Sequence, residues 1–316
     1  MHDSVYDIII IGGGPAGLTA GIYASRSRMR TLLVEKMGCG GQAVITDWLE
    51  NYPGFPDGIA GFELAGKMEE QARKFGLALE FDEVCELVLP ANQDDDKIIR
   101  TTGGEYRASA VIVASGASHK MLNVPGEVPL RGKGVSYCAT CDGPFFKDKD
   151  VAVIGGGNSA VQEAVYLTRF AGTVTLIHRR DRLRATHILQ ERAKANNKIR
   201  FVWNSVVTEI KGADRVDSVC VRNLIDNSAS DIAVNGVFVF VGLEPHSGFA
   251  RGKLDLDAGG YISTDDTMHT SARGVFACGD VREKLLRQVV TAAGEGATAA
   301  FAAQEYIEEV RGIAYK

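Results

Sequence analysis

The chain has 316 residues, of which 35 are Lys or Arg and 40 are Asp or Glu, and its net charge is −5. The length fits about two domains of roughly 100–200 residues each, and 45% apolar with 24% charged residues is typical of a globular protein with a core. The acidic balance argues against a surface that binds nucleic acid. Six cysteines are too few for a disulfide scaffold, so we expect a protein of the reducing cytoplasm.

The uncharged run Ile8–Ser25 is predicted to be neither a signal peptide nor a membrane helix. Asp7 stands where a signal peptide would carry basic residues, and five Gly or Pro residues between positions 12 and 17 interrupt the apolar side chains. No other run approaches about 20 apolar residues, so the sequence predicts no insertion into a membrane.

An internal repeat indicates the fold. The segment DIIIIGGGPAG at 7–17 recurs 143 positions later as DVAVIGGGNSA at 150–160. Each copy has an apolar strand, a glycine-rich turn and a helical pattern, and a second apolar run follows at Thr31–Val34 or Val174–Ile177. Two such βαβ units predict an α/β protein with two Rossmann-like nucleotide-binding domains.

Two loop-rich segments, around Pro125 and Pro245, flank the second repeat and suggest the domain boundaries. We therefore expect residues 118–245 to form a domain inserted into another, which is built from residues 1–117 and 246–316. Other expected elements are strands at 111–116 and 274–277, a solvated hairpin tip at 92–97 and a helix over about 288–311.

The first repeat carries a Gly-x-Gly-x-x-Gly motif between a strand and a helix. Such glycines allow a tight turn and close approach of a pyrophosphate, and the helix N-terminus attracts the phosphates. Glu35, eighteen residues after the last glycine, stands where an acid accepts hydrogen bonds from an unphosphorylated ribose. These features favour FAD over a purely structural turn, and its expected contacts here are Gly12, Gly14, Pro15, Ala16, Gly17 and Glu35.

The second repeat carries Gly-x-Gly-x-x-Ala at Gly155, Gly157 and Ala160. In place of the acid it has a histidine followed by arginines, and the expected contacts among them are His178, Arg179, Arg180 and Arg184. A guanidinium group pairs with a 2′-phosphate that a carboxylate would repel. This substitution favours NADP(H) over the alternative of a solvated basic face.

Cys138 and Cys141 form the only Cys-x-x-Cys pair of the chain, and Asp142 follows them. A zinc site would need a second Cys pair or a His pair, which the sequence does not offer, so no metal is expected. The pair precedes Gly155 by 14 residues, in a chain with two redox-nucleotide motifs, which favours a reversible disulfide over inert thiols. The other four cysteines are expected to be small buried residues.

Further short motifs follow in order: GGQ at 40–42, ENYPG at 50–54, VSYCATCDG at 135–143, HRRDRLR at 178–184, GVFACGD at 274–280 and RQV at 287–289. Together with the two glycine motifs, they resemble low-molecular-weight bacterial thioredoxin reductases over almost the whole chain. The resemblance implies further FAD contacts at Gly41, Gln42, Asn51, Asp280, Arg287, Gln288 and Val289. It implies NADPH contacts at Gly157, Asn158, Ser159, Ala160, Glu163, His178, Arg179, Arg180 and Arg184.

The resemblance also implies a reaction, in which electrons pass from NADPH to FAD, then to the Cys138–Cys141 disulfide and then to thioredoxin. Cys141 would face the flavin, Cys138 would attack thioredoxin, and Asp142 would protonate the leaving thiolate, although Asp142 could instead be a turn or cap residue. The inserted domain would rotate so that nicotinamide and disulfide reach the flavin in turn. Members of the family are usually homodimers.

Three positions depart from patterns common in that family. Lys133 stands where some members have Arg, Leu243 where some have His, and Pro144 where an aromatic is common, which leaves Phe145 and Phe146 for partner docking. The partner therefore stays open, and one alternative is an NADPH-dependent flavoprotein reductase of a glutaredoxin-like or peroxiredoxin partner. A second is a flavoprotein that responds to redox state without turning over a disulfide.

Overall fold

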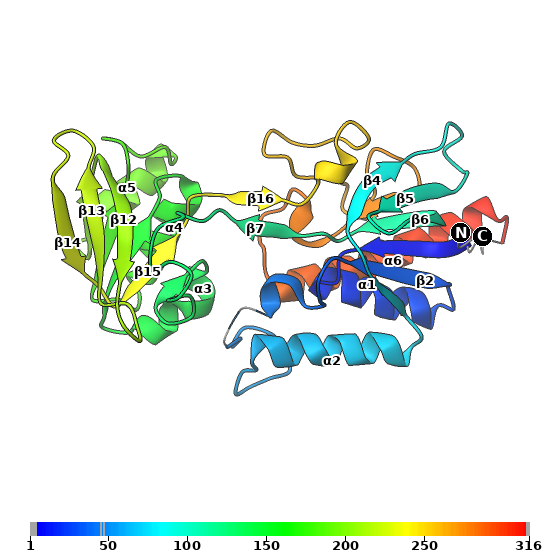
Figure 1. Cartoon of the computed structure of the whole chain (residues 1–316), viewed down its shortest axis with the longest axis horizontal. Helices are drawn as coiled ribbons and strands as arrows, with labels where there is room; N and C mark the ends of the chain where they lie inside the picture. The colour runs from blue at the N-terminus through cyan, green and yellow to red at the C-terminus, as the bar shows by residue number, and fades with distance from the viewer. Residues whose placement is uncertain (1–4, 45, 47, 314–316) are drawn as a thin grey trace. The chain divides into compact units, whose positions relative to one another are not determined.

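The computed structural model describes residues 5–44, 46 and 48–313. Its contacts divide the chain into two compact units, Met1–Ser118 with Glu244–Lys316, and His119–Leu243. The chain passes between the units twice, through strands β7 (Ala117–His119) and β16 (Leu243–Pro245), which pair with each other (Figure 1). The second unit is thus inserted into the first by two paired connections.

The first unit is built on a sheet in the strand order β3-β2-β1-β6-β5-β4, and β17 pairs with β6. Its strands are β1 (Val5–Ile11), β2 (Thr31–Glu35), β3 (Ala78–Phe81), β4 (Val84–Val88), β5 (Lys97–Thr101), β6 (Glu105–Val113) and β17 (Val275–Ala277). Its helices are α1 (Pro15–Arg26), α2 (Gly61–Lys74) and α6 (Val289–Val310), with short 3₁₀ turns η1 (Gly41–Ala43), η3 (Gly248–Ala250) and η4 (Gly279–Val281). Because β17 runs parallel to β6, the C-terminal segment completes the sheet of the N-terminal one.

Alternate residues of β1 pack on opposite faces of this sheet. Ile8 and Ile10 join the core formed with α1, α2 and α6, whereas Ile9 and Ile11 face a second core that includes Ile262. Side chains of a strand alternate between faces, so a sheet buried on both sides needs apolar residues at every position. This requirement explains the unbroken run of isoleucines.

The second unit repeats the scheme with a parallel sheet in the order β11-β10-β9-β15-β8. Its strands are β8 (Val135–Ser136), β9 (Asp150–Ile154), β10 (Thr173–Ile177), β11 (Ile199–Val202), β12 (Ser205–Lys211), β13 (Ser218–Asn223), β14 (Ala229–Ala233) and β15 (Gly236–Val239). Its helices are α3 (Ala139–Asp142), α4 (Asn158–Leu167) and α5 (His187–Ala195), with the 3₁₀ turn η2 (Gly143–Phe146). One face packs on α4 and α5, and the other on the antiparallel sheet β12-β13-β14.

The predicted α/β class with two Rossmann-like units is confirmed. Two finer expectations are wrong. Residues 92–96 do turn between β4 and β5, but Lys97 is fully buried, and its Nζ donates to the carbonyl oxygens of Gln93 (2.9 Å) and Ser109 (3.0 Å) and to the Tyr306 hydroxyl (2.7 Å). Burial lowers the pKa of Lys97 to about 8.

Of the four cysteines expected to be buried, only Cys278 is, whereas Cys85 is exposed and Cys39 and Cys220 are half-buried. Among the described residues, every helix is too short or too polar to cross a bilayer.

Candidate functional site

The first glycine turn joins β1 to α1. Gly12 has a φ of +105°, and a Cβ there would lie 2.5 Å from the carbonyl oxygen of Ala114. A Cβ on Gly17 would overlap the carbonyl oxygen of Gly12. Gly14 caps α1 without a side-chain hydrogen bond, and the nearest atom to a Cβ there would be the Cα of Gly41, at 4.0 Å. The turn therefore presents unpaired helix N–H groups beside open space, which suits a phosphate.

Glu35, at the end of β2, organises this turn. Its Oε2 accepts a hydrogen bond from the Gly13 N–H (2.7 Å), and its Oε1 accepts one from the Met37 N–H (3.2 Å). A carboxylate has about four acceptor positions, so Glu35 retains capacity for a ribose hydroxyl. Cys39 lies beside it, and burial, with the charges of Glu69 and Glu35, raises the pKa of that thiol to about 12. The Cys39 thiol therefore stays protonated and unreactive.

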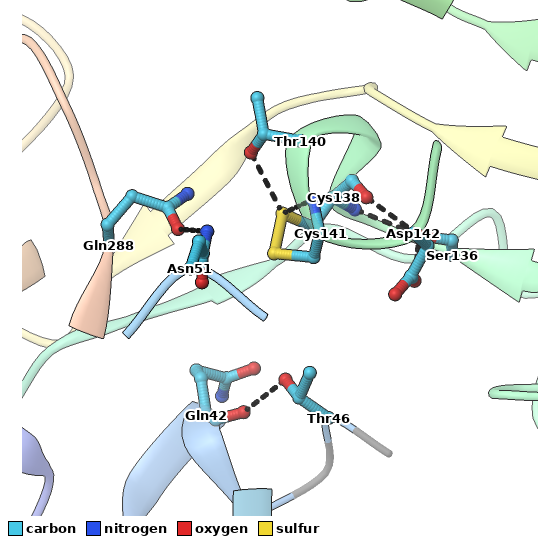
Figure 2. Close-up of a disulfide and its surroundings, with 9 residues drawn as sticks. All are labelled: Gln42, Thr46, Asn51, Ser136, Cys138, Thr140, Cys141, Asp142 and Gln288. Carbon is cyan, nitrogen blue, oxygen red and sulfur yellow. Dashed lines mark hydrogen bonds between the residues drawn. A yellow bond between two sulfur atoms is a disulfide. The ribbon is translucent and has the colours of Figure 1, made fainter. Parts of the chain in front are cut away.

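The FAD contacts predicted near the start of α6 come together within the first unit. Asn51 Nδ2 donates to Gln288 Oε1 at 2.9 Å (Figure 2). Gln288 caps α6 in a capping box with Thr291, so Val289 begins the helix. The guanidinium carbon of Arg287 lies 4.3 Å from the centre of the Tyr261 ring, and its buried Nε has no hydrogen-bond partner in residues 5–44, 46 and 48–313.

Asp280 is another predicted contact with an unsatisfied polar atom. Among the described residues its buried Oδ1 has no hydrogen-bond partner, and the nearest cation there, the Nζ of Lys284, is 3.6 Å away. Burial raises the pKa of Asp280, while the charges of Lys284 and Arg287 oppose that shift. A buried acceptor without a donor fits a hydroxyl-bearing ligand at this position.

Sequence reasoning missed the charged side chains that hold this segment in place. Glu295 of α6 accepts a hydrogen bond from the Gly279 N–H (2.7 Å) through Oε2, and its Oε1 pairs with Lys284 (3.0 Å) and Arg282 (3.1 Å). The three side chains are 15%, 4% and 12% exposed. A lone acid in the Ala- and Gly-rich start of α6 was a signal that could have identified Glu295.

The second glycine turn joins β9 to α4. Gly155 has a φ of +147°, and a Cβ there would lie 2.6 Å from the Cβ of Ala160, while a Cβ on Gly157 would meet open space. Asn158 Oδ1 accepts a hydrogen bond from the Thr186 N–H (2.9 Å), and Ser159 is exposed. The turn thus has the same open N-terminus as the first one.

The basic cluster lies beside this turn. The ring of His178 is buried against Gly156, and no described residue forms a hydrogen bond with its Nε2. Burial, and then the charges of Arg184, Arg179 and Arg180, lower the pKa of His178. All three arginines are exposed, so neutral His178 stands among guanidinium groups that are open to a ligand.

Glu163, on the same helix α4, completes the predicted contacts of this unit. Its buried Oε2 has no hydrogen-bond partner in the part of the chain that the structure describes, and burial raises the pKa of its carboxyl group. A buried, unpaired carboxyl oxygen fits a hydrogen-bond donor supplied by a ligand.

The cysteine pair forms a disulfide at the start of α3, with the two Cα atoms 5.3 Å apart (Figure 2). Cys138 caps the helix, and its Sγ accepts a hydrogen bond from the Cys141 N–H (3.2 Å) and lies 3.3 Å from Thr140 Oγ1. Asp142 Oδ2 accepts a hydrogen bond from Ser136 Oγ at 2.6 Å, and Ser136 Oγ also accepts one from the Cys138 N–H (3.1 Å). One hydroxyl thus connects the predicted acid to the cysteine segment.

The two phenylalanines expected to dock a partner differ in exposure. Phe145 is 46% exposed. Phe146 packs in the core, with its ring 5.2 Å from that of Phe238. Only Phe145 offers an apolar surface next to the disulfide segment.

The family model described as pyridine nucleotide-disulphide oxidoreductase matches residues 6–296. The chain belongs to this family. A thioredoxin reductase of Peptoclostridium litorale is 50% identical over 98% of this chain and 99% of its own, and one of Bacillus subtilis strain 168 is 47% identical over 98% and 97%. The crystal structure of thioredoxin reductase from Streptococcus pyogenes MGAS5005 matches with a TM-score of 0.92 at 47% identity, covering 97% of this chain and 99% of that one.

Oxidoreductases of this family depend on a flavin and a pyridine nucleotide. The residues of this chain fit such groups. Each glycine turn leaves a helix N-terminus open, and buried polar atoms of Asp280, Arg287, Glu163 and His178 have no hydrogen-bond partner within the described part of the chain. Buried polar groups are rarely left unpaired, so these atoms fit hydrogen-bonding groups of a ligand.

Proposed function

We propose that this protein is a thioredoxin reductase that uses NADPH and FAD. The observation that carries the proposal is the Cys138–Cys141 disulfide, which lies in the same unit as the glycine turn with the arginine cluster. Relatives at 47–50% identity over nearly their full length bear the name thioredoxin reductase, which supports thioredoxin as the partner.

FAD is assigned to the first glycine turn and NADPH to the second. Glu35 supports an unphosphorylated ribose at the first turn, and the arginines that follow His178 support a 2′-phosphate at the second. When bound, the two groups supply the hydride and the electron pair that open the disulfide. Asp280, Asn51 and Gln288 would orient the flavin end of FAD.

The chain's own sulfurs then carry out thiol–disulfide exchange. The Cys138 thiolate attacks one sulfur of the partner disulfide, forming a mixed disulfide and releasing one partner thiolate. The Cys141 thiolate attacks the Cys138 sulfur, which restores the Cys138–Cys141 bond and releases the second partner thiolate. The Cys141 N–H that points at the Cys138 sulfur would stabilise the attacking thiolate. Asp142, oriented by Ser136, would deliver a proton to a leaving thiolate.

Three further expectations belong to this proposal. The inserted unit would rotate about its two connections, so that the nicotinamide and the disulfide reach the flavin in turn. The protein would act as a homodimer in the cytoplasm, without a nucleic-acid or membrane partner. Phe145 would contribute to docking of the partner. Lys133 and Leu243 would allow a partner preference that differs from that of other members of the family.

The proposal is tested by following NADPH oxidation with purified thioredoxin from the same organism. Steady turnover with NADPH, and much less with NADH, is expected. Cys138→Ser should keep the NADPH-dependent bleaching of the flavin but lose thioredoxin turnover, whereas Cys85→Ser, at an exposed cysteine outside the site, should behave as wild type.

Turnover with a glutaredoxin-like or peroxiredoxin protein in place of thioredoxin would favour the alternative partner. A yellow protein that reduces none of these disulfides would favour a redox-responsive binding protein and refute the proposal.

A further inference from the structure

A buried carboxylate close to the disulfide segment takes no part in the steps above. Glu127 is 1% exposed, and its carboxylate accepts three hydrogen bonds. Oε1 accepts from the Leu122 N–H (2.9 Å) and the Tyr137 hydroxyl (2.8 Å), and Oε2 accepts from the Asn123 N–H (2.7 Å). Burying a carboxylate is costly unless donors surround it, so these three groups stabilise Glu127 in the interior.

The Tyr137 side chain makes contacts through its ring as well as through its hydroxyl group. It is 7% exposed, its ring centre lies 5.2 Å from that of His119, and the guanidinium carbon of Arg131 lies 4.9 Å from the same centre. Burial, and then the hydrogen bond to Glu127, raise the pKa of Tyr137, so its hydroxyl remains a donor. His119 ends β7, one of the two connections to the first unit.

Two neighbouring residues therefore fix the backbone just before Cys138 through different partners. Ser136 binds Asp142 and the Cys138 N–H, while Tyr137 binds Glu127. Ser136 ends β8 and Tyr137 follows it directly, so the two anchors restrain consecutive residues of this backbone.

We propose that Tyr137 and Glu127 are positioning residues for the Cys138–Cys141 pair. Their hydrogen bond holds the end of β8 where Cys138 begins α3, so that the Cys138 sulfur stays within bonding range of Cys141. A restrained dithiol closes to a disulfide more readily, and as it closes it passes two electrons to the acceptor disulfide, which becomes two thiols. The anchor therefore makes the pair more strongly reducing. The consequence for turnover rests on the proposed function.

The test removes one hydroxyl and keeps the ring. Tyr137→Phe should shift the equilibrium of the cysteine pair with glutathione about five- to tenfold toward the dithiol, because a hydrogen bond to a charged group is lost. The turnover number for thioredoxin should fall by a similar factor, with the KM for NADPH unchanged. Tyr166→Phe is the matched control: its ring contacts Phe170 and Arg169, and among the described residues its hydroxyl has no hydrogen-bond partner.

Glu127→Gln, which keeps the volume but not the carboxylate, should shift the equilibrium in the same direction. The proposal is overturned if the equilibrium constant of the cysteine pair with glutathione is the same in Tyr137→Phe as in Tyr166→Phe. It is also overturned if Tyr137→Phe lowers the urea midpoint of unfolding without changing that equilibrium constant. The glutathione measurement needs neither NADPH nor thioredoxin. A wild-type protein that fails to turn over thioredoxin would therefore refute the proposed function without deciding this inference.

Discussion

The two glycine turns have nearly the same backbone but opposite surroundings. Around the first, two acids have partners within the protein: Glu35 binds the Gly13 N–H, and Glu295 binds the Gly279 N–H together with Lys284. Buried atoms of Asp280 and Arg287 are the exceptions, since they have no hydrogen-bond partner among the described residues. Around the second, the arginines that follow His178 are exposed and the buried oxygen of Glu163 is unpaired. A site whose charged side chains lie mostly within the protein suits a resident cofactor, whereas exposed guanidinium groups suit a ligand that binds and leaves in every cycle.

The largest effect is expected from removing the exposed charges of the second turn. Arg179→Ala combined with Arg180→Ala should raise the KM for NADPH by a factor of about 100 or more, since each charge-assisted pair lost costs roughly 1.5–3 kcal/mol. The KM for NADH should change little, because NADH has no 2′-phosphate. Steady-state kinetics with both nucleotides measures the difference.

Arg182→Ala is the matched control for that pair, since Arg182 is an exposed arginine of the same segment outside the predicted contacts. If the double variant raised the KM for NADPH and for NADH by the same factor, the arginines would not bind the 2′-phosphate. The contrast between the two turns would then fail as well.

A smaller effect is expected from disturbing the internal charges of the first turn. Glu295→Gln should weaken FAD binding about tenfold, because Arg282 loses its counter-charge, Lys284 keeps only Asp280, and the Gly279 segment loses a charged acceptor. Titration of the apoprotein with FAD, followed by flavin fluorescence, gives the dissociation constant. Glu305→Gln, at an exposed position of the same helix, should bind FAD as wild type does. An unchanged affinity of Glu295→Gln for FAD would show that these charges do not stabilise the binding site of a resident cofactor.

The smallest effect concerns His178, which replaces the acid of the first repeat. Burial and the neighbouring arginines lower its pKa in the folded protein, so below the unfolded-state value near 6.5 the unfolded chain binds more protons than the folded one. The free energy of unfolding should therefore fall as pH falls through that range, and less steeply in His178→Gln. Urea unfolding at pH 7.5 and 5.5 compares the two proteins, and identical pH dependence would show that His178 is not buried as a neutral base.

Much of the site follows from local sequence because backbone geometry demands particular residues. Gly12 and Gly155 adopt positive φ values, and a side chain at Gly17 would overlap the backbone, so only glycine fits there and the motif is visible in the sequence. The capped start of α6 at Gln288 was likewise expected to within a residue. Lys97, in contrast, looked like part of a polar turn, because its partner Tyr306 is 209 positions away.

The sequence by itself determined the α/β class, the two nucleotide turns and the cysteine pair, since each depends on residues within a few positions of one another. Only the tertiary structure decided which charges are satisfied internally and which stay open, that Phe146 is packed while Phe145 is exposed, and that Glu127 reaches Tyr137. Burial and pairing depend on segments far apart in the chain. Periodicity and spacing cannot report these contacts, because they carry no information about which distant side chain fills a given space.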